Sequence, residues 1–132
     1  MKDDDRGKIM NRQFSLQVKD YSGLRFDKIT ATDIDGFMDF QDKVFVFLEY
    51  KHGDGMPPYG QKLALERLCD ACEKAGKFCI LILARHETNG DIDCANAIVT
   101  SYRTKGAWHE PRNPTTVREA VEKFHDYIAP FF

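Results

Sequence analysis

Two carboxylates and an amine stand at the ends of two short apolar segments in the first half of the chain. Asp35 precedes one segment, and the apolar run 44–48 continues directly into Glu49, Tyr50 and Lys51. A strand as apolar as residues 44–48 should be buried on both faces, where an ionised side chain is costly unless it is paired or bound to a metal. Ionisable groups gathered at the end of such a strand therefore indicate a functional site.

The turn between the two segments predicts how these side chains are placed. If residues 41–43 close a hairpin, residues equidistant from its middle lie opposite each other. Asp35 then faces Glu49, and Asp33 faces Lys51. Directly opposed residues have Cβ atoms about 5 Å apart, close enough for two carboxylates to share a cation. A slip of one residue would move the two carboxylates to opposite faces, so the prediction depends on this register.

The same residues also have an ordinary structural interpretation. Asp33 and Asp35 could open a turn, because Asp is common at turns, and Glu49 and Lys51 could be an exposed strand end. The length of the apolar run before Glu49 favours the functional interpretation. Like charges that face each other repel, which favours a divalent ion between them. We therefore predict a divalent metal site.

The order of these residues resembles the signature of a nuclease superfamily. In the PD-(D/E)XK nucleases, an Asp opens one strand, and an acidic residue, a spacer and a Lys close the next. Asp35 with Glu49-Tyr50-Lys51 resembles this signature. The resemblance covers roughly residues 29–104. It implies the restriction endonuclease-like fold of Holliday junction resolvases and related phage proteins, an α/β/α sandwich on a central mixed sheet. The chain departs from the family in two ways. Ile34 or Thr32 stands where a Pro is usual, and no Glu occurs before Glu49.

The resemblance implies metal-dependent hydrolysis of DNA phosphodiester bonds, with Mg²⁺ or Mn²⁺ as cofactor. Asp35, Glu49 and the backbone carbonyl of Tyr50 would hold the ion, and Asp33 is a candidate for a further carboxylate. Lys51 would orient the attacking water and offset charge in the transition state. DNA is the expected partner, and a small nuclease of this kind can act as a homodimer.

Two other functions fit the same residues. A catalytically silent nuclease-like fold could bind DNA or serve as an assembly subunit, and the missing upstream Glu favours it. An unrelated metal-dependent hydrolase could act on a small phosphorylated substrate. An open groove would favour the nuclease, and a deep closed pocket would favour the small-molecule hydrolase.

The remaining pattern predicts the elements that position the site. Apolar residues at spacings of three and four predict a helix from Gln61 to Ala75, followed by Gly76. Gln61 lies on the inward stripe of this helix, where its amide could contact a metal-bound water or a phosphate, or could simply cap the helix. Further segments are predicted as a strand at 24–30, strands at 78–84 and 96–102, a last helix that begins with a capping box at 116–119, and an ambiguous strand or short helix at 11–18.

Basic and aromatic residues lie between the last predicted strand and the last helix: Arg103, Lys105, Trp108 and Arg112. Such a mixture suits phosphate contact and base stacking. It equally suits a solvated loop whose tryptophan packs on the core. The net charge of −2 gives no general attraction for nucleic acid, so DNA contact would have to come from a local patch such as this one.

Length and composition bound the remaining possibilities. A chain of 132 residues with 42% hydrophobic content predicts a single domain over 1–132, in which residues 1–10 form a charged tail. No apolar run reaches membrane-spanning length, so we expect a cytoplasmic protein of a bacterium or a phage-infected cell. Cys69 and Cys72 form a CxxC on the inward stripe of a helix, and we expect free thiols there rather than a zinc site.

Overall fold

The computed structural model describes residues 7–8, 17–53, 55, 57 and 59–131 of the chain. It contains two units, residues 1–31 and 32–132. In the first unit, a short 3-10 helix at Ser22–Leu24 precedes a bridge between Phe26 and Ile29. The strand predicted at 24–30 is wrong, because Asp27 has a left-handed φ of 58° that turns the chain back on itself. The predictions for 1–10 and 11–18 fall almost entirely outside the described residues.

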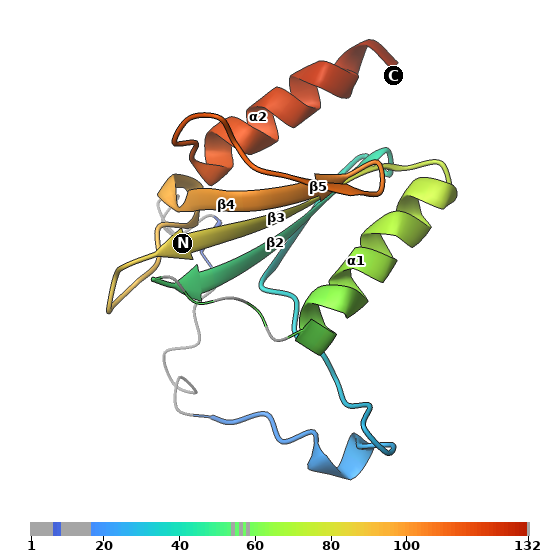
Figure 1. The fold of residues 1–132 in the computed structure, drawn as a ribbon, viewed down its shortest axis with the longest axis vertical. Helices are drawn as coiled ribbons and strands as arrows, with labels where there is room; N and C mark the ends of the chain where they lie inside the picture. The colour runs from blue at the N-terminus through green and yellow to red at the C-terminus, as the bar shows by residue number, and fades with distance from the viewer. Residues whose placement is uncertain (1–6, 9–16, 54, 56, 58, 132) are drawn as a thin grey trace. The chain divides into compact units, whose positions relative to one another are not determined.

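Residues 32–132 form one α/β domain whose five-stranded mixed sheet carries a helix on each face (Figure 1). The strands lie side by side in chain order: β1 (Gly36–Phe40), β2 (Val44–His52), β3 (Phe78–His86), β4 (Ile98–Thr104) and β5 (Ala107–His109). Only β2 and β3 are parallel. Parallel neighbours need a long crossover, and α1 (Tyr59–Lys74) supplies it, while α2 (Val117–Ile128) follows the sheet.

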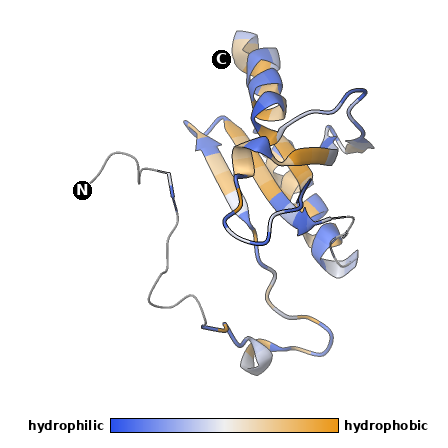
Figure 2. Cartoon of the chain, turned by 90° about the vertical axis from the view of Figure 1, so that its left-hand side faces the viewer, coloured by the Kyte–Doolittle hydropathy of each residue, from blue (hydrophilic) through white to orange (hydrophobic). Residues whose placement is uncertain are grey.

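The central strand β3 is buried on both sides, and its alternating side chains divide the interior into two layers. Ile80 and Ile82 point toward α2, where they pack with Val117 and Ile128. Leu81 and Leu83 point toward α1, where they pack with Leu65 and other side chains. We call these the α2 face and the α1 face. Figure 2 shows the hydrophobic residues concentrated in the strands between the two helices.

The β1–β2 hairpin has the register that the sequence predicts. Gly36 pairs with Leu48 and Phe40 with Val44, so paired residues are equidistant from position 42. The turn is closed by a hydrogen bond of 3.1 Å from the Lys43 N–H to the Phe40 carbonyl. Gln41 and Asp42 both have left-handed backbone conformations, a backbone twist that suits a tight hairpin.

The other predicted elements are confirmed, with small shifts at their ends. Both helices and the strands β2, β3 and β4 are present, and the capping box at Thr116 and Glu119 is formed. β4 begins two residues later than predicted because Cys94–Asn96 form a 3-10 turn. Strand β5 was missed, since three residues are too few to show a period; the left-handed pair Lys105 and Gly106 turns the chain into it. No helix in the described part of the chain is long and apolar enough to cross a membrane.

Candidate active site

The site is centred on Glu49, a carboxylate that strand β2 carries into the interior. The residues of β2 alternate, so Phe47, Glu49 and Lys51 project toward the α1 face. Glu49 is 1% exposed and lies beside Leu83 of the parallel strand β3. An apolar strand buried on both sides therefore ends in a buried acid, as the sequence predicts.

Asp35 lies next to Glu49 at the point where the β1–β2 ladder ends. Gly36 pairs with Leu48, so Asp35 directly precedes the ladder and its partner position is Glu49. One oxygen of Asp35, Oδ2, accepts a hydrogen bond of 2.8 Å from the backbone N–H of Tyr50. A Cβ on Gly36 would lie 3.3 Å from Leu48, so glycine allows the close approach that leads into Asp35.

Gln61 reaches the same site from the first turn of α1. Its Nε2 donates a hydrogen bond of 2.5 Å to Oε2 of Glu49 and a longer one of 3.4 Å to the Asp33 carbonyl. The helix period placed Gln61 on the inward stripe, and the structure confirms that placement. Its amide therefore holds one of the two oxygens of Glu49.

The electrostatics of Glu49 are those of a buried acid beside a second acid. Burial, followed by the contact with the Asp35 carboxyl, raises the pKa of Glu49 to about 7, and the charge of Lys51 opposes that rise. Oε1 of Glu49 is buried and has no hydrogen-bond partner in the part of the chain that the structure describes. A buried oxygen without a partner is costly, and a cation beside it would supply the missing partner.

These observations fit a hard divalent cation at Asp35 and Glu49. Mg²⁺ and Mn²⁺ prefer carboxylate and carbonyl oxygens, and Mg²⁺ is commonly held by one or two carboxylates with water completing its shell. Such an ion would use Oε1 of Glu49, which has no hydrogen-bond partner among the described residues. A positive ion would also favour the ionised form of Glu49, which burial and the neighbouring Asp35 disfavour.

Comparisons with family models, with curated proteins and with solved structures found no match.

Asp33 and Tyr50 are placed differently from the two central acids. The ladder ends before Asp33, so the expected pairing with Lys51 is not part of the sheet. The backbone carbonyl of Asp33 accepts a hydrogen bond from the Gln61 amide. The Tyr50 ring points to the α2 face, where its hydroxyl donates to the Cys94 carbonyl at 3.3 Å. The roles of the Asp33 carboxylate and the Tyr50 carbonyl as metal ligands stay predictions.

A different group has three potential ligand atoms close together: Cys69, Asp70 and Glu73 of α1. Two of these side chains are already engaged, because Asp70 forms an ion pair with Arg103 at 2.8 Å and Glu73 accepts a hydrogen bond from the Lys105 backbone. Cys69 is buried in the α1-face core, and this burial agrees with its place on the inward stripe of the helix. This group is accounted for by contacts within the domain.

The four residues predicted to contact DNA are divided between the two faces. Arg103 makes two hydrogen bonds to Asp70, and Trp108 donates from its ring nitrogen to Glu66 at 2.5 Å, so both contact α1. Lys105 and Arg112 line a cavity on the α2 face. The structure does not bring the four together into one surface, and their contact with DNA stays a prediction.

A pair of histidines next to the site was not predicted as a unit. His52 ends β2 and His86 ends β3, and parallel pairing places their rings 5.3 Å apart between centroids. His86 is further held by Thr88, at 3.1 Å from its Nδ1. The sequence did contain a signal for this pair. Each histidine follows an apolar run that predicts a buried strand, and a crossover helix between two such strands makes them parallel neighbours.

Proposed function

We propose that this chain hydrolyses phosphodiester bonds of DNA with Mg²⁺ or Mn²⁺ held by Asp35 and Glu49. The observation that carries the proposal is the buried Glu49 carboxylate beside a second carboxylate, with no hydrogen-bond partner for its Oε1 among the described residues. Lys51 lies two residues further along the same strand and on the same face. The resemblance of Asp35 and Glu49-Tyr50-Lys51 to the PD-(D/E)XK signature supports the choice of substrate. A mixed sheet with one helix on each face is compatible with the restriction endonuclease-like fold that this resemblance implies.

Each side chain of the site has a separate task in this proposal. A bound divalent ion polarises a phosphate and lowers the pKa of a coordinated water. Gln61 donates a hydrogen bond to one oxygen of Glu49, and the Tyr50 N–H donates one to an oxygen of Asp35. These hydrogen bonds orient the two acids as ligands. The ammonium group of Lys51 offsets negative charge that develops on the phosphate during attack.

The alternative is a catalytically silent subunit of the same fold that binds DNA. Within the described residues, no third carboxylate joins Asp35 and Glu49 in a close group of ligand atoms. The sequence also has no Glu before Glu49 and a net charge of −2. These observations favour the alternative, and a cleavage assay separates the two functions.

The decisive experiment is cleavage of supercoiled plasmid and of a synthetic four-way junction with Mg²⁺ or Mn²⁺. Glu49→Gln keeps the shape of the side chain and removes its charge, and Lys51→Met removes the amine. We expect either change to slow cleavage by about 100-fold or more, the usual effect of removing a group that stabilises the transition state electrostatically. The matched controls are Glu122→Gln and Lys74→Met. Both residues are exposed, Glu122 on α2 and Lys74 in the last turn of α1, and both variants should cut at the native rate.

Two results would count against the proposed activity. Cutting that survives Glu49→Gln would place the hydrolysis elsewhere or in another protein. A folded native chain that cuts none of these substrates, yet shifts them in a gel, would support the silent DNA-binding subunit.

Metal binding can be tested without any substrate. A ligand that binds only the folded chain stabilises it by about 2.7 kcal/mol at 100 times its dissociation constant. We expect Mn²⁺ to raise the thermal unfolding midpoint of the native chain and of Glu122→Gln, and to leave that of Glu49→Gln nearly unchanged. Equal shifts in all three would show that the ion binds away from Glu49.

A further inference from the structure

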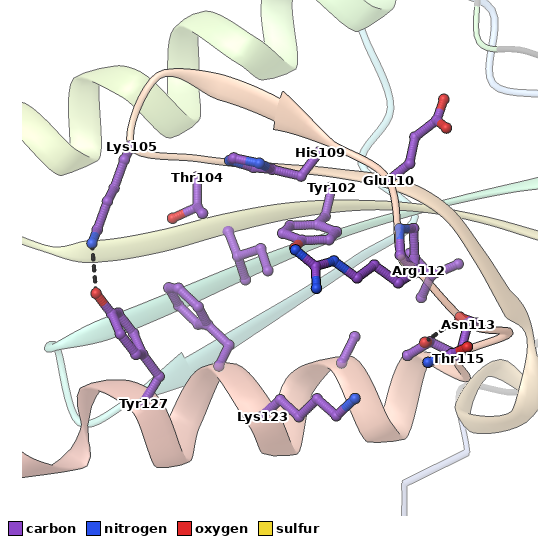
Figure 3. A pocket seen from close by; sticks show the side chains of 15 residues that line it. Tyr102, Thr104, Lys105, His109, Glu110, Arg112, Asn113, Thr115, Lys123 and Tyr127 are labelled. Atoms are coloured by element: carbon purple, nitrogen blue, oxygen red, sulfur yellow. Dashed lines mark hydrogen bonds between the residues drawn. The ribbon is translucent and has the colours of Figure 1, made fainter.

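A cavity of about 750 Å³ lies on the α2 face (Figure 3). It is on the opposite side of the sheet from Glu49. Strand β4, strand β5, the segment 110–115 and α2 contribute its walls. Its floor includes the apolar side chains of Ile80, Val99 and Phe124. We call it the α2 pocket. Its volume falls in the range of about 300–1,000 Å³ that is common for sites that bind small molecules.

An irregularity in β4 shapes the floor of this pocket. Val99 pairs with Ala84 and Ser101 with Leu83, so Thr100 is an extra residue in the ladder. Such a bulge shifts the alternation of side chains by one position. As a result, Val99 and Tyr102 both face α2, although their numbers differ by three.

The rim of the α2 pocket is positively charged. Lys105, Arg112 and Lys123 come from the β4–β5 turn, the segment before α2 and α2 itself. Figure 3 shows the Arg112 side chain extending across the pocket beside Tyr102, while the carboxylate of Glu110 points away from it. Within the described residues, Arg112 takes part in no ion pair. The charge in the pocket is therefore available to an anion.

Aromatic rings form the other part of the lining. Tyr102 and His109 are stacked, with ring centroids 5.2 Å apart and an interplanar angle of 27°. Tyr127 accepts a hydrogen bond of 2.7 Å from the Lys105 ammonium, which also lies 4.9 Å from the centre of the Tyr127 ring. This contact links the β4–β5 turn to α2 at one end of the pocket (Figure 3). The pocket thus offers both planar surfaces and cations.

We propose that the α2 pocket binds a small phosphorylated molecule with a planar ring, the chemistry of a nucleoside monophosphate. Arg112 and Lys123 would contact the phosphate, since a guanidinium and an ammonium are its usual partners. The Tyr102–His109 stack and the apolar floor would contact the ring. A fatty acid has a single charge and leaves most of the rim without a partner, and free phosphate makes no use of the rings. This site goes beyond the proposed hydrolysis and does not depend on it.

The test is calorimetric titration of the native chain with deoxyadenosine 5′-monophosphate in the presence of a metal chelator. Deoxyadenosine lacks the phosphate and inorganic phosphate lacks the ring, so both should bind at least about tenfold more weakly. Arg112→Ala and Lys123→Ala should each weaken nucleotide binding by about tenfold or more, as expected for a lost hydrogen bond to a charged group. The control is Arg118→Ala, because Arg118 lies on α2 but pairs with Glu122 and is exposed.

Three outcomes would overturn the proposal. The first is no detectable binding of the nucleotide by the folded native chain. The second is equal binding by Arg112→Ala, Lys123→Ala and the Arg118→Ala control. The third is binding that survives Arg112→Ala but is lost in Glu49→Gln, which would place the nucleotide in the candidate active site. Binding that Glu49→Gln retains and Arg112→Ala loses supports the α2 pocket, whatever the cleavage assay finds.

Discussion

The two faces of the sheet, which lie on either side of strand β3, carry charges of opposite sign in different surroundings. On the α1 face, the Glu49 carboxylate is buried and one of its oxygens has no partner among the described residues. On the α2 face, three cations stand at the rim of an open pocket, and water can solvate them. A buried charge is expensive and calls for a permanent counter-ion, whereas exposed charges cost little until a ligand arrives.

The two sites also differ in the elements that form them, and this difference suits them to different ligands. The α1-face site occupies the end of a buried strand and is held by hydrogen bonds from Gln61 and the Tyr50 backbone. The α2 pocket is assembled from a turn, a loop and a helix surface. A rigid strand end suits ligands that must be held in fixed positions, and a pocket of several elements suits recognition of a whole molecule.

The largest expected difference between the two faces is in how their charged residues make the free energy of unfolding depend on pH. The pKa of Glu49 is raised from 4.5 to about 7 in the folded chain. As pH rises from about 4.5 to about 7, the unfolded chain ionises this group first, so unfolding becomes easier. The contribution of Glu49 to the free energy of unfolding is therefore fully present below about pH 4.5, and it is lost as the pH rises through about 7. The loss is on the order of 3 kcal/mol.

Urea unfolding at about pH 5 and about pH 7.5, with a chelator present, measures this loss. Glu49→Gln should remove most of the difference between the two pH values, because its amide does not ionise. Arg112→Ala, on the other face, should keep the native difference. If Glu49→Gln and the native chain lose the same free energy, another group is responsible.

The next effect concerns the support of the site on the α1 face. Gln61→Ala removes the amide that holds Oε2 of Glu49. We expect Mn²⁺ affinity and cleavage each to fall by about 10–100-fold, as is usual when a partner of a metal ligand is lost. Arg67→Ala is the matched control, since Arg67 lies exposed on the same helix. Nucleotide binding in the α2 pocket should be the same in both variants, and a loss there would mean that the two faces are coupled.

The smallest effect concerns the helix that covers the other face. Thr116 caps α2 by accepting a hydrogen bond from the Glu119 N–H with its side chain, and the Thr116 N–H donates a second one to the Glu119 carboxylate. Thr116→Ala should lower the free energy of unfolding by about 1 kcal/mol, the usual value for a lost cap. Cleavage at a temperature where the variant stays folded should match the native rate. A specific loss of cleavage would show that α2 contributes to the α1-face site.

Local patterns in the sequence were enough to predict the candidate site. The hairpin register follows from the turn at 41–43, and it brings Asp35 beside Glu49. The helix period turns Gln61 inward, and the crossover then carries it to β2. The strand predicted at 24–30 failed because a single left-handed residue, Asp27, reverses the chain. Nothing in the apolar pattern of that segment marks the reversal.

What the sequence by itself determined is therefore the position of the acids, the inward amide and the amine, because hairpins and helices have fixed local periods. Only the tertiary structure decided the pKa of Glu49, which depends on what α1 buries. It alone also decided where the basic residues point. The extra residue Thr100 turns Tyr102 toward α2, and Arg103 instead pairs with Asp70 of α1. A bulge arises from the fit between neighbouring strands, and a single chain segment does not encode it.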